Sequence, residues 1–101
     1  MEKMIEDKQA QLHELCHRFH VSRLEVFGSA SVGRLREDSD LDFLVEFDDS
    51  VGASRFDTFF DLLESLKQLF NRPVDLVEPG GLRNPYFLRR VNETRRPLYV
   101  A

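Results

Sequence analysis

The sequence predicts a two-layer α/β domain, an α+β arrangement in which helices pack on a small sheet. Helical and strand-like segments alternate along the whole chain, and no repeat, linker or low-complexity tract interrupts them. The 101 residues predict one domain, residues 1–101, because domains typically run to ~100–150 residues. A helix also lies in the long connection before the strand predicted at 74–77, which suits a crossover between strands of one sheet.

The first half of the chain predicts one long helix and two strands. Apolar residues recur at helical spacing over residues 3–19, namely Ile5, Leu12, Leu15 and Phe19. Residues 23–27 (RLEVF) alternate polar and apolar side chains and end at Gly28, which is typical of a strand. Residues 40–47 (DLDFLVEF) are the clearest strand of the chain. A polar, charged loop separates the two strands.

The second half predicts two helices and two shorter strands. The helix expected over 54–70 has an apolar stripe made of Phe56, Phe59, Phe60, Leu63, Leu66 and Phe70. A buried strand follows at 74–77. Pro85 suits the first position of a helix that runs to about Asn92, because proline lacks the N–H that is unpaired there anyway. Residues 97–100 (PLYV) predict a last edge strand.

Composition excludes several classes of protein. Fourteen Lys and Arg against eighteen Asp and Glu give a net charge of -4, which disfavours direct nucleic-acid binding through the phosphate backbone. A single cysteine cannot form an internal disulfide. No apolar run approaches the ~20 residues of a membrane span, and the charged N-terminus lacks a signal-peptide core. We therefore expect a cytoplasmic protein without a membrane partner.

Three features of the sequence together indicate a site for phosphates and a metal ion. Gly28 and Ser29 stand where a strand turns into a short helix that Ser29 is expected to cap, and free N–H groups there suit an anion. Asp40 and Asp42 are two positions apart on a strand, so their carboxylates face the same side. Asp75 lies within an apolar strand, where a buried carboxylate needs a partner or a cation.

The chemistry that fits this set is nucleotidyl transfer with Mg²⁺. Magnesium prefers oxygen ligands and commonly joins a few carboxylates to substrate phosphates. Taken one at a time, the features also have simpler explanations. An Asp-x-Asp pair is often a solvated strand face, Gly-Ser is often a plain turn, and Asp75 could pair with Arg72. Their combination is what favours the site.

These residues also carry a resemblance. Val26-Phe27-Gly28-Ser29, followed after ten residues by Asp40-Leu41-Asp42, resembles the Gly-Ser…Asp-x-Asp motif of the DNA polymerase β-like nucleotidyltransferase superfamily. The short chain looks like its minimal nucleotidyltransferase (MNT) branch, which includes antitoxins paired with HEPN-domain toxins. The resemblance covers nearly the whole chain and implies a palm-like α/β fold with a mixed sheet.

The resemblance implies a role for each matching residue. Asp40 and Asp42 would be metal ligands, and Asp75 would be the third carboxylate, as general base or metal-polarised partner. Gly28 and Ser29 would hold the nucleotide phosphates. Many minimal members carry arginine directly after Gly-Ser, whereas this chain has Ala30; Arg34 or Arg36 would then supply the missing charge.

The expected function is therefore Mg²⁺-dependent transfer of AMP from ATP to a hydroxyl, by the resemblance a tyrosine of a HEPN-type toxin. The alternatives are an antitoxin that neutralises its partner by contact alone and a binding subunit of a larger assembly.

Two other patterns have weaker claims on function. His13-Glu14-Leu15-Cys16-His17 matches the H-E-x-x-H zinc motif, although one face of an amphipathic helix explains it better. The arginines between Arg83 and Arg96 are either a solvated face or a patch for an acidic partner, RNA or a triphosphate.

Overall fold

Four strands form one mixed sheet in the order β3-β2-β1-β4. The computed structural model describes residues 2–101. β1 is antiparallel to β2 and to β4, whereas β2 and β3 run parallel. This architecture confirms the predicted α/β class and the edge position of the last strand. The elements in chain order are α1 (Lys3–Glu6), α2 (Gln9–Arg18), β1 (Val21–Phe27), the 3₁₀ turn η1 (Gly28–Ala30), β2 (Leu41–Phe47), η2 (Asp49–Ser54), α3 (Arg55–Phe70), β3 (Val74–Val77), η3 (Pro79–Gly81), α4 (Pro85–Thr94) and β4 (Arg96–Val100).

The crossover between the parallel strands is made by α3, as the sequence predicts. A connection between parallel neighbours has to return the chain to the same end of the sheet, and a helix of this length does so. The helix ends at Asn71, which adopts the left-handed conformation with φ of 50°. Asparagine tolerates that conformation better than most residues, so it terminates the helix and directs the chain into β3.

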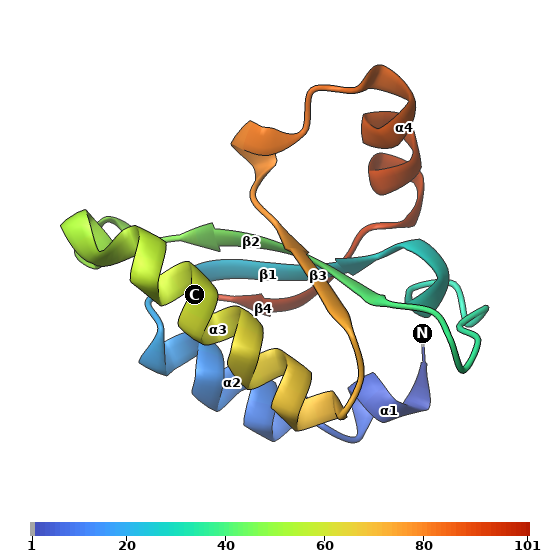
Figure 1. Ribbon diagram of the computed structural model, residues 1–101, viewed down its shortest axis with the longest axis horizontal. Helices are drawn as coiled ribbons and strands as arrows, with labels where there is room; N and C mark the ends of the chain where they lie inside the picture. The colour runs from blue at the N-terminus through green and yellow to red at the C-terminus, as the bar shows by residue number, and fades with distance from the viewer. Residues whose placement is uncertain (1) are drawn as a thin grey trace.

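The helices cover the two faces of the sheet unequally. α2 and α3 pack on one face, and α4 lies over the other (Figure 1). The main core lies between the sheet and the first pair, and its largest fully buried side chains include Phe43, Ile5, Leu12, Leu24, Leu41, Leu62 and Leu66. Beneath α4, Val91 packs with Phe27 and Leu44, and Phe87 meets Phe27 edge-on at 5.8 Å between ring centroids. α4 is thereby held next to the C-terminal end of β1.

The long N-terminal helix predicted over 3–19 is in fact two helices, with a break at Asp7–Lys8. The first turn is held by contacts that periodicity does not reveal. The Glu2 N–H donates to the Ala30 carbonyl at 3.0 Å, and its carboxylate accepts from the Leu35 N–H at 3.1 Å. These bonds tie α1 to the loop after β1, and the chain changes direction before α2 begins.

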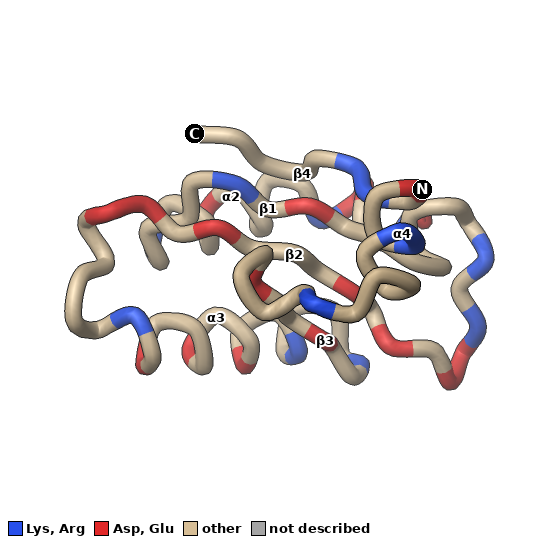
Figure 2. The backbone as a smooth tube through the Cα atoms, turned by 90° about the horizontal axis from the view of Figure 1, so that it is seen from above, with Lys and Arg blue, Asp and Glu red and all other residues tan. Residues whose placement is uncertain are grey.

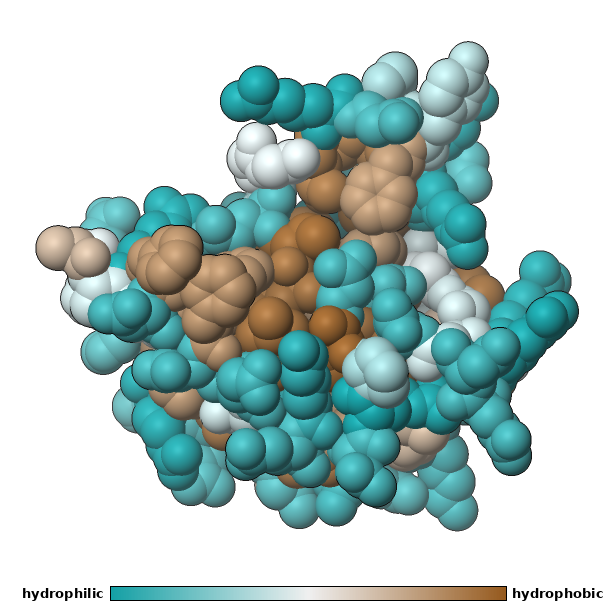
Figure 3. All heavy atoms as spheres, in the orientation of Figure 1, coloured by the Kyte–Doolittle hydropathy of each residue, from teal (hydrophilic) through white to brown (hydrophobic). Residues whose placement is uncertain are grey.

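The apolar stripe predicted on α3 is only partly core. Leu66 is fully buried, and so is Leu62, which is not among the predicted stripe residues. Phe56 is 73% exposed and Phe60 46% exposed, because the first turns of α3 extend beyond the edge of the sheet. Figure 3 shows apolar side chains gathered on the surface over the start of α3. Among the described residues, none of the helices is long and apolar enough to cross a membrane.

A buried ion pair fixes the junction between α4 and β4. The carboxylate of Glu25 in β1 is 2% exposed and accepts from Arg95 Nε at 3.1 and 3.2 Å, with Arg23 Nε at 3.3 Å. Burial alone would raise the pKa of Glu25, but the two guanidinium groups hold it below the usual range.

Arg95→Ala is expected to lower the free energy of unfolding by about 2–3 kcal/mol, because it leaves Glu25 buried with weaker compensation. Urea unfolding at pH 7 measures the change. The difference should shrink as the pH falls through the depressed pKa of Glu25, since stability from that carboxylate exists only above it. Arg18→Ala removes an exposed pair with Glu14 and should cost less than ~0.5 kcal/mol. Equal losses in the two variants would contradict the role given to Arg95.

Candidate active site

The end of β1 forms a small cradle at Gly28 and Ser29. Gly28 has φ of +73°, a left-handed conformation that glycine adopts without strain, and it begins the 3₁₀ turn η1. The Gly28 N–H donates to Thr94 Oγ1 of α4 at 2.9 Å. Ser29 is half-buried, and its carbonyl accepts from the Arg34 N–H at 2.8 Å. The prediction that Ser29 caps a helix is wrong, since Phe27 occupies that position and no side chain caps the turn.

The strand pairing brings two of the predicted carboxylates side by side. Asp42 in β2 is in register with Asp75 in the parallel strand β3 and with Phe27 in β1. A Cβ atom built on Gly28 would lie 2.6 Å from Asp42 Oδ2, so only a glycine lets this carboxylate rest against the cradle. Gly28, Asp42 and Asp75 therefore lie next to one another at the end of the sheet where β1 ends.

The other predicted site residues lie at its edge. Asp40 is exposed and stands one position before β2, which begins at Leu41 rather than at Asp40 as expected. Arg34 is exposed, and within residues 2–101 its side chain forms no ion pair. The expectation that Asp75 is buried is wrong: β3 lies at the sheet edge and its Asp75 faces outward. Arg72 bonds to the Glu37 carbonyl at 3.3 Å and not to Asp75.

Like charges meet at Asp42. Partial burial, together with the charges of Asp75 and Asp40, raises the pKa of its carboxyl to about 6, although the charge of Arg90 acts in the opposite direction. Figure 2 shows acidic positions on β2 and β3 near α4, which carries basic ones. Holding partly buried carboxylates close together costs free energy, and a cation between them would lower that cost.

The carboxylates fit a magnesium ion that is shared with a substrate. In residues 2–101 no group of three or more His, Cys, Asp or Glu side chains is placed to hold a metal ion without help. Magnesium, however, is often bound through one or two carboxylates together with phosphates and water. Asp42 with its neighbour Asp75 matches that donor set.

A nucleotidyltransferase domain model matches residues 9–98 of the chain, which includes the cradle and all three carboxylates. The chain belongs to the nucleotidyltransferase domain family. The family confirms the resemblance drawn from Gly28-Ser29 and Asp40-Leu41-Asp42, and with it the transferase class of the protein.

Known nucleotidyltransferases agree with the fold as well as with the sequence. Protein adenylyltransferase MntA of Thermococcus cleftensis is 39% identical over 75 residues, which are 74% of this chain and 73% of that protein. A solved structure assigned to the minimal nucleotidyltransferases is 32% identical, covers 94% of this chain and 93% of its own, and superimposes with a TM-score of 0.76.

A third likeness concerns the fold alone. It is to a chain in the complex of the tri-AMPylated HEPN toxin of Shewanella oneidensis with an MNT antitoxin, at 17% identity and a TM-score of 0.64. It covers 96% of this chain and 73% of the other.

Sequence reasoning missed two residues that lie beside the candidate site, both on α4. Thr94 holds the Gly28 N–H, and Arg90 is close enough to influence the pKa of Asp42. The only sequence signal was the basic stretch from Arg83 to Arg96, which did not distinguish one arginine from another. Arg95 in that stretch is structural, since it binds Glu25.

The H-E-x-x-H motif on α2 has a structural explanation in the nucleotidyltransferase fold. His13 Nε2 lies 3.0 Å from the Leu98 carbonyl, and its ring packs edge-on against Tyr99. His13 therefore joins α2 to β4. His17 is exposed on the same helix, and within the described residues neither histidine belongs to a metal-binding cluster.

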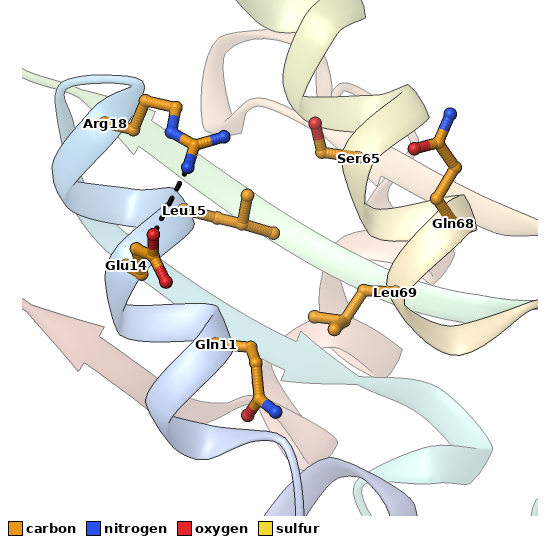
Figure 4. Close-up of a pocket in the computed structure, with 7 residues that line it drawn as sticks. All are labelled: Gln11, Glu14, Leu15, Arg18, Ser65, Gln68 and Leu69. Atoms are coloured by element: carbon orange, nitrogen blue, oxygen red, sulfur yellow. Dashed lines mark hydrogen bonds and ion pairs between the residues drawn. The ribbon is translucent and has the colours of Figure 1, made fainter.

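Two hollows lie away from the carboxylates. A groove of about 360 Å³ runs between α2 and α3 and is lined by Gln11, Glu14, Leu15, Arg18, Ser65, Gln68 and Leu69 (Figure 4). A more apolar pocket of about 480 Å³ lies at the start of α3, bounded by Arg55, Phe56, Phe59, Phe60 and Glu78. Arg55 and Glu78 form an ion pair at its rim, with Nη2 and Oε1 2.6 Å apart.

Proposed function

We propose that the protein transfers AMP from ATP to a tyrosine hydroxyl of a HEPN-type toxin in the cytoplasm and so acts as the antitoxin of the pair. The observation that carries the proposal is the close approach of Asp42 to the Gly28 cradle, with Asp75 beside it. A phosphate cradle next to paired carboxylates suits phosphoryl chemistry. The names of the relatives, a protein adenylyltransferase and an antitoxin bound to an AMPylated toxin, support the acceptor class.

Each residue of the site has a part in the reaction. Ser29 binds the phosphates of the donor and orients its α-phosphorus, and Gly28, whose N–H is taken by Thr94, lets the donor approach the backbone closely. Asp40, Asp42 and Asp75 would hold Mg²⁺, which supplies positive charge to the phosphate oxygens when bound. Asp75 accepts the proton of the attacking hydroxyl. The acceptor oxygen bonds to the α-phosphorus as the bond to the bridging oxygen breaks, and pyrophosphate leaves.

The exposure of Asp75 suits an acceptor as large as a protein. Its side chain projects from the edge strand β3, so a tyrosine on a partner's surface can approach it without the site opening. Asp42, by contrast, is half-buried between strands and serves the donor side. The two carboxylates thus face different reactants although they are neighbours in the sheet.

The test is transfer of label from α-labelled ATP to the cognate partner in the presence of Mg²⁺, with Asp75→Asn as the variant. Wild type should label one protein, and mass spectrometry should find AMP on a tyrosine. Asp75→Asn should slow transfer by about 10²-fold or more, the scale of a lost general base. A labelled partner with undiminished rate in the variant would contradict the role of Asp75. Tight capture of the partner without label would favour an antitoxin that acts by contact alone.

A further inference from the structure

The donor site needs a positive charge that its own loop does not supply. Three carboxylates and a triphosphate would meet there, and like charges repel strongly when partly buried. Ala30 follows Gly28-Ser29 and is fully buried, so that position offers no cation. Arg34 further along the loop is exposed, and its backbone N–H, not its side chain, bonds to Ser29.

α4 is fastened to the cradle by a short chain of hydrogen bonds. Thr94 Oγ1 accepts from the Gly28 N–H at 2.9 Å and donates to the Arg90 carbonyl at 2.8 Å. The Ser31 hydroxyl also donates to the Thr94 carbonyl. The backbone of Arg90 is therefore connected to the phosphate cradle through one side chain.

This connection decides which side of α4 faces the site. Residues four apart lie one above the other on a helix, so Arg90 stands one turn from Thr94 on the same side. Val91, the next residue, is fully buried against Phe27 and Leu44. Arg90 thus lies at the margin of the buried face, above the strands that carry the carboxylates.

The guanidinium of Arg90 is also available. The side chain is exposed, and among residues 2–101 it forms no ion pair and no hydrogen bond of its own. Arg95 on the same helix end is occupied by Glu25, and Arg55 by Glu78.

We propose that Arg90 binds the phosphates of the donor nucleotide from above the cradle, opposite Gly28 and Asp42. This assignment rests on the proposed function, because it takes a nucleoside triphosphate as the ligand. A guanidinium donates two parallel hydrogen bonds to phosphate oxygens and keeps its charge at any physiological pH. Arg90 then supplies from α4 the cation that the loop lacks, and it neutralises charge on the departing pyrophosphate.

The experiment compares Arg90→Ala with Arg89→Ala. Arg89 is the adjacent arginine, also exposed, but it lies roughly 200° around the helix from Val91 and so faces away from the sheet. Binding of ATP and of AMP is measured by calorimetry with Mg²⁺, and transfer is measured with the partner. Arg90→Ala should raise the Kd for ATP about tenfold or more and that for AMP about threefold or less. Arg90→Lys should fall between wild type and alanine, while Arg89→Ala stays within about twofold of wild type.

The outcomes separate this inference from the proposed function. Wild type that labels its partner, together with an Arg90→Ala variant that binds ATP as Arg89→Ala does, overturns the role of Arg90 alone. A tenfold loss in Arg34→Ala with none in Arg90→Ala assigns the phosphates to the loop and also overturns it. Wild type that neither binds ATP nor transfers AMP overturns the proposed function and this inference with it. Thermal unfolding of each variant controls for folding, since an exposed arginine should leave Tm unchanged.

Discussion

Replacing Asp42 by asparagine is expected to slow AMP transfer severely and, at neutral pH, to make the protein more stable. The carboxylate is needed to hold a cation against the donor phosphates, and its loss should slow transfer by about 10²–10³-fold, the scale seen when one electrostatic contact to a transition state is removed. In the protein without nucleotide, the same carboxylate is half-buried beside two other acids. The amide of asparagine keeps the shape and removes the repulsion.

The sign of the stability change follows from the pKa of Asp42. Because the folded protein raises that pKa to about 6, the folded state keeps a proton that the unfolded chain releases near pH 4. Stability from this group is therefore present below about pH 4 and is lost as the pH rises through 6. With allowance for solvent around the half-exposed group, Asp42→Asn should gain about 1–2 kcal/mol at pH 7.5.

Urea unfolding without Mg²⁺ at pH 5 and pH 7.5 measures this gain, which should be larger at the higher pH. Asp61→Asn provides the control, because Asp61 is exposed on α3 far along the chain from the site. It should change neither stability nor transfer. If Asp42→Asn is less stable than wild type at pH 7.5, the carboxylate makes favourable contacts in the free enzyme, and repulsion from its acidic neighbours does not dominate.

Replacing Gly28 by alanine is expected to disrupt the site more than any other single methyl addition. The new Cβ would lie 2.6 Å from Asp42 Oδ2, well inside contact distance, and the backbone there has φ of +73°. The left-handed conformation alone costs an alanine roughly 1–2 kcal/mol. The collision adds to this cost, because Asp42 is held by β2 and must turn away from the cradle. Transfer should fall by about 10²-fold, since the reacting groups lose their alignment.

Gly33→Ala separates the two effects. Gly33 has nearly the same φ, +72°, but nothing within 4 Å of the position its Cβ would take. Gly33→Ala should therefore lose only the stability that the left-handed backbone conformation costs an alanine, measured as a drop in Tm. Its rate of transfer should stay close to that of wild type. In an Asp42→Ala background the collision is absent, so adding Gly28→Ala there should cost no more stability than Gly33→Ala costs in the wild type. Equal behaviour of Gly28→Ala and Gly33→Ala would mean that the contact with Asp42 is unimportant.

Much of the fold was predictable because it depends on local patterns. The alternation in 40–47 defined β2 to within one residue and placed Asp42 on the face opposite Leu41 and Phe43, since side chains alternate along a strand. The helix before β3 indicated the crossover, and Pro85 marked the start of α4. The Gly-Ser and Asp-x-Asp spacing indicated the family that the comparison with known proteins confirmed.

Other features depended on which segments meet in space. The helical periodicity over 3–19 carries no information about the hydrogen bonds of Glu2 with Ala30 and Leu35. The break in the helix at Asp7–Lys8 was therefore not predicted. The apolar neighbours of Asp75 suggested burial, but α4 packs over Phe27 and Leu44 and leaves Asp75 on the edge strand exposed to solvent. The reverse holds for Glu25, a charged residue in an alternating strand that is buried because Arg95 reaches it from the far end of the chain.

The sequence by itself therefore determined the fold class and the family, and it singled out three carboxylates as candidates, because these depend on residue spacing along single elements. Only the tertiary structure decided that Gly28 touches Asp42, that Asp75 faces outward and that α4 stands over the site with Thr94 on Gly28. Those relations join residues as many as 66 positions apart. They arise when β1, β2 and α4 pack together, and no local pattern along the chain specifies them.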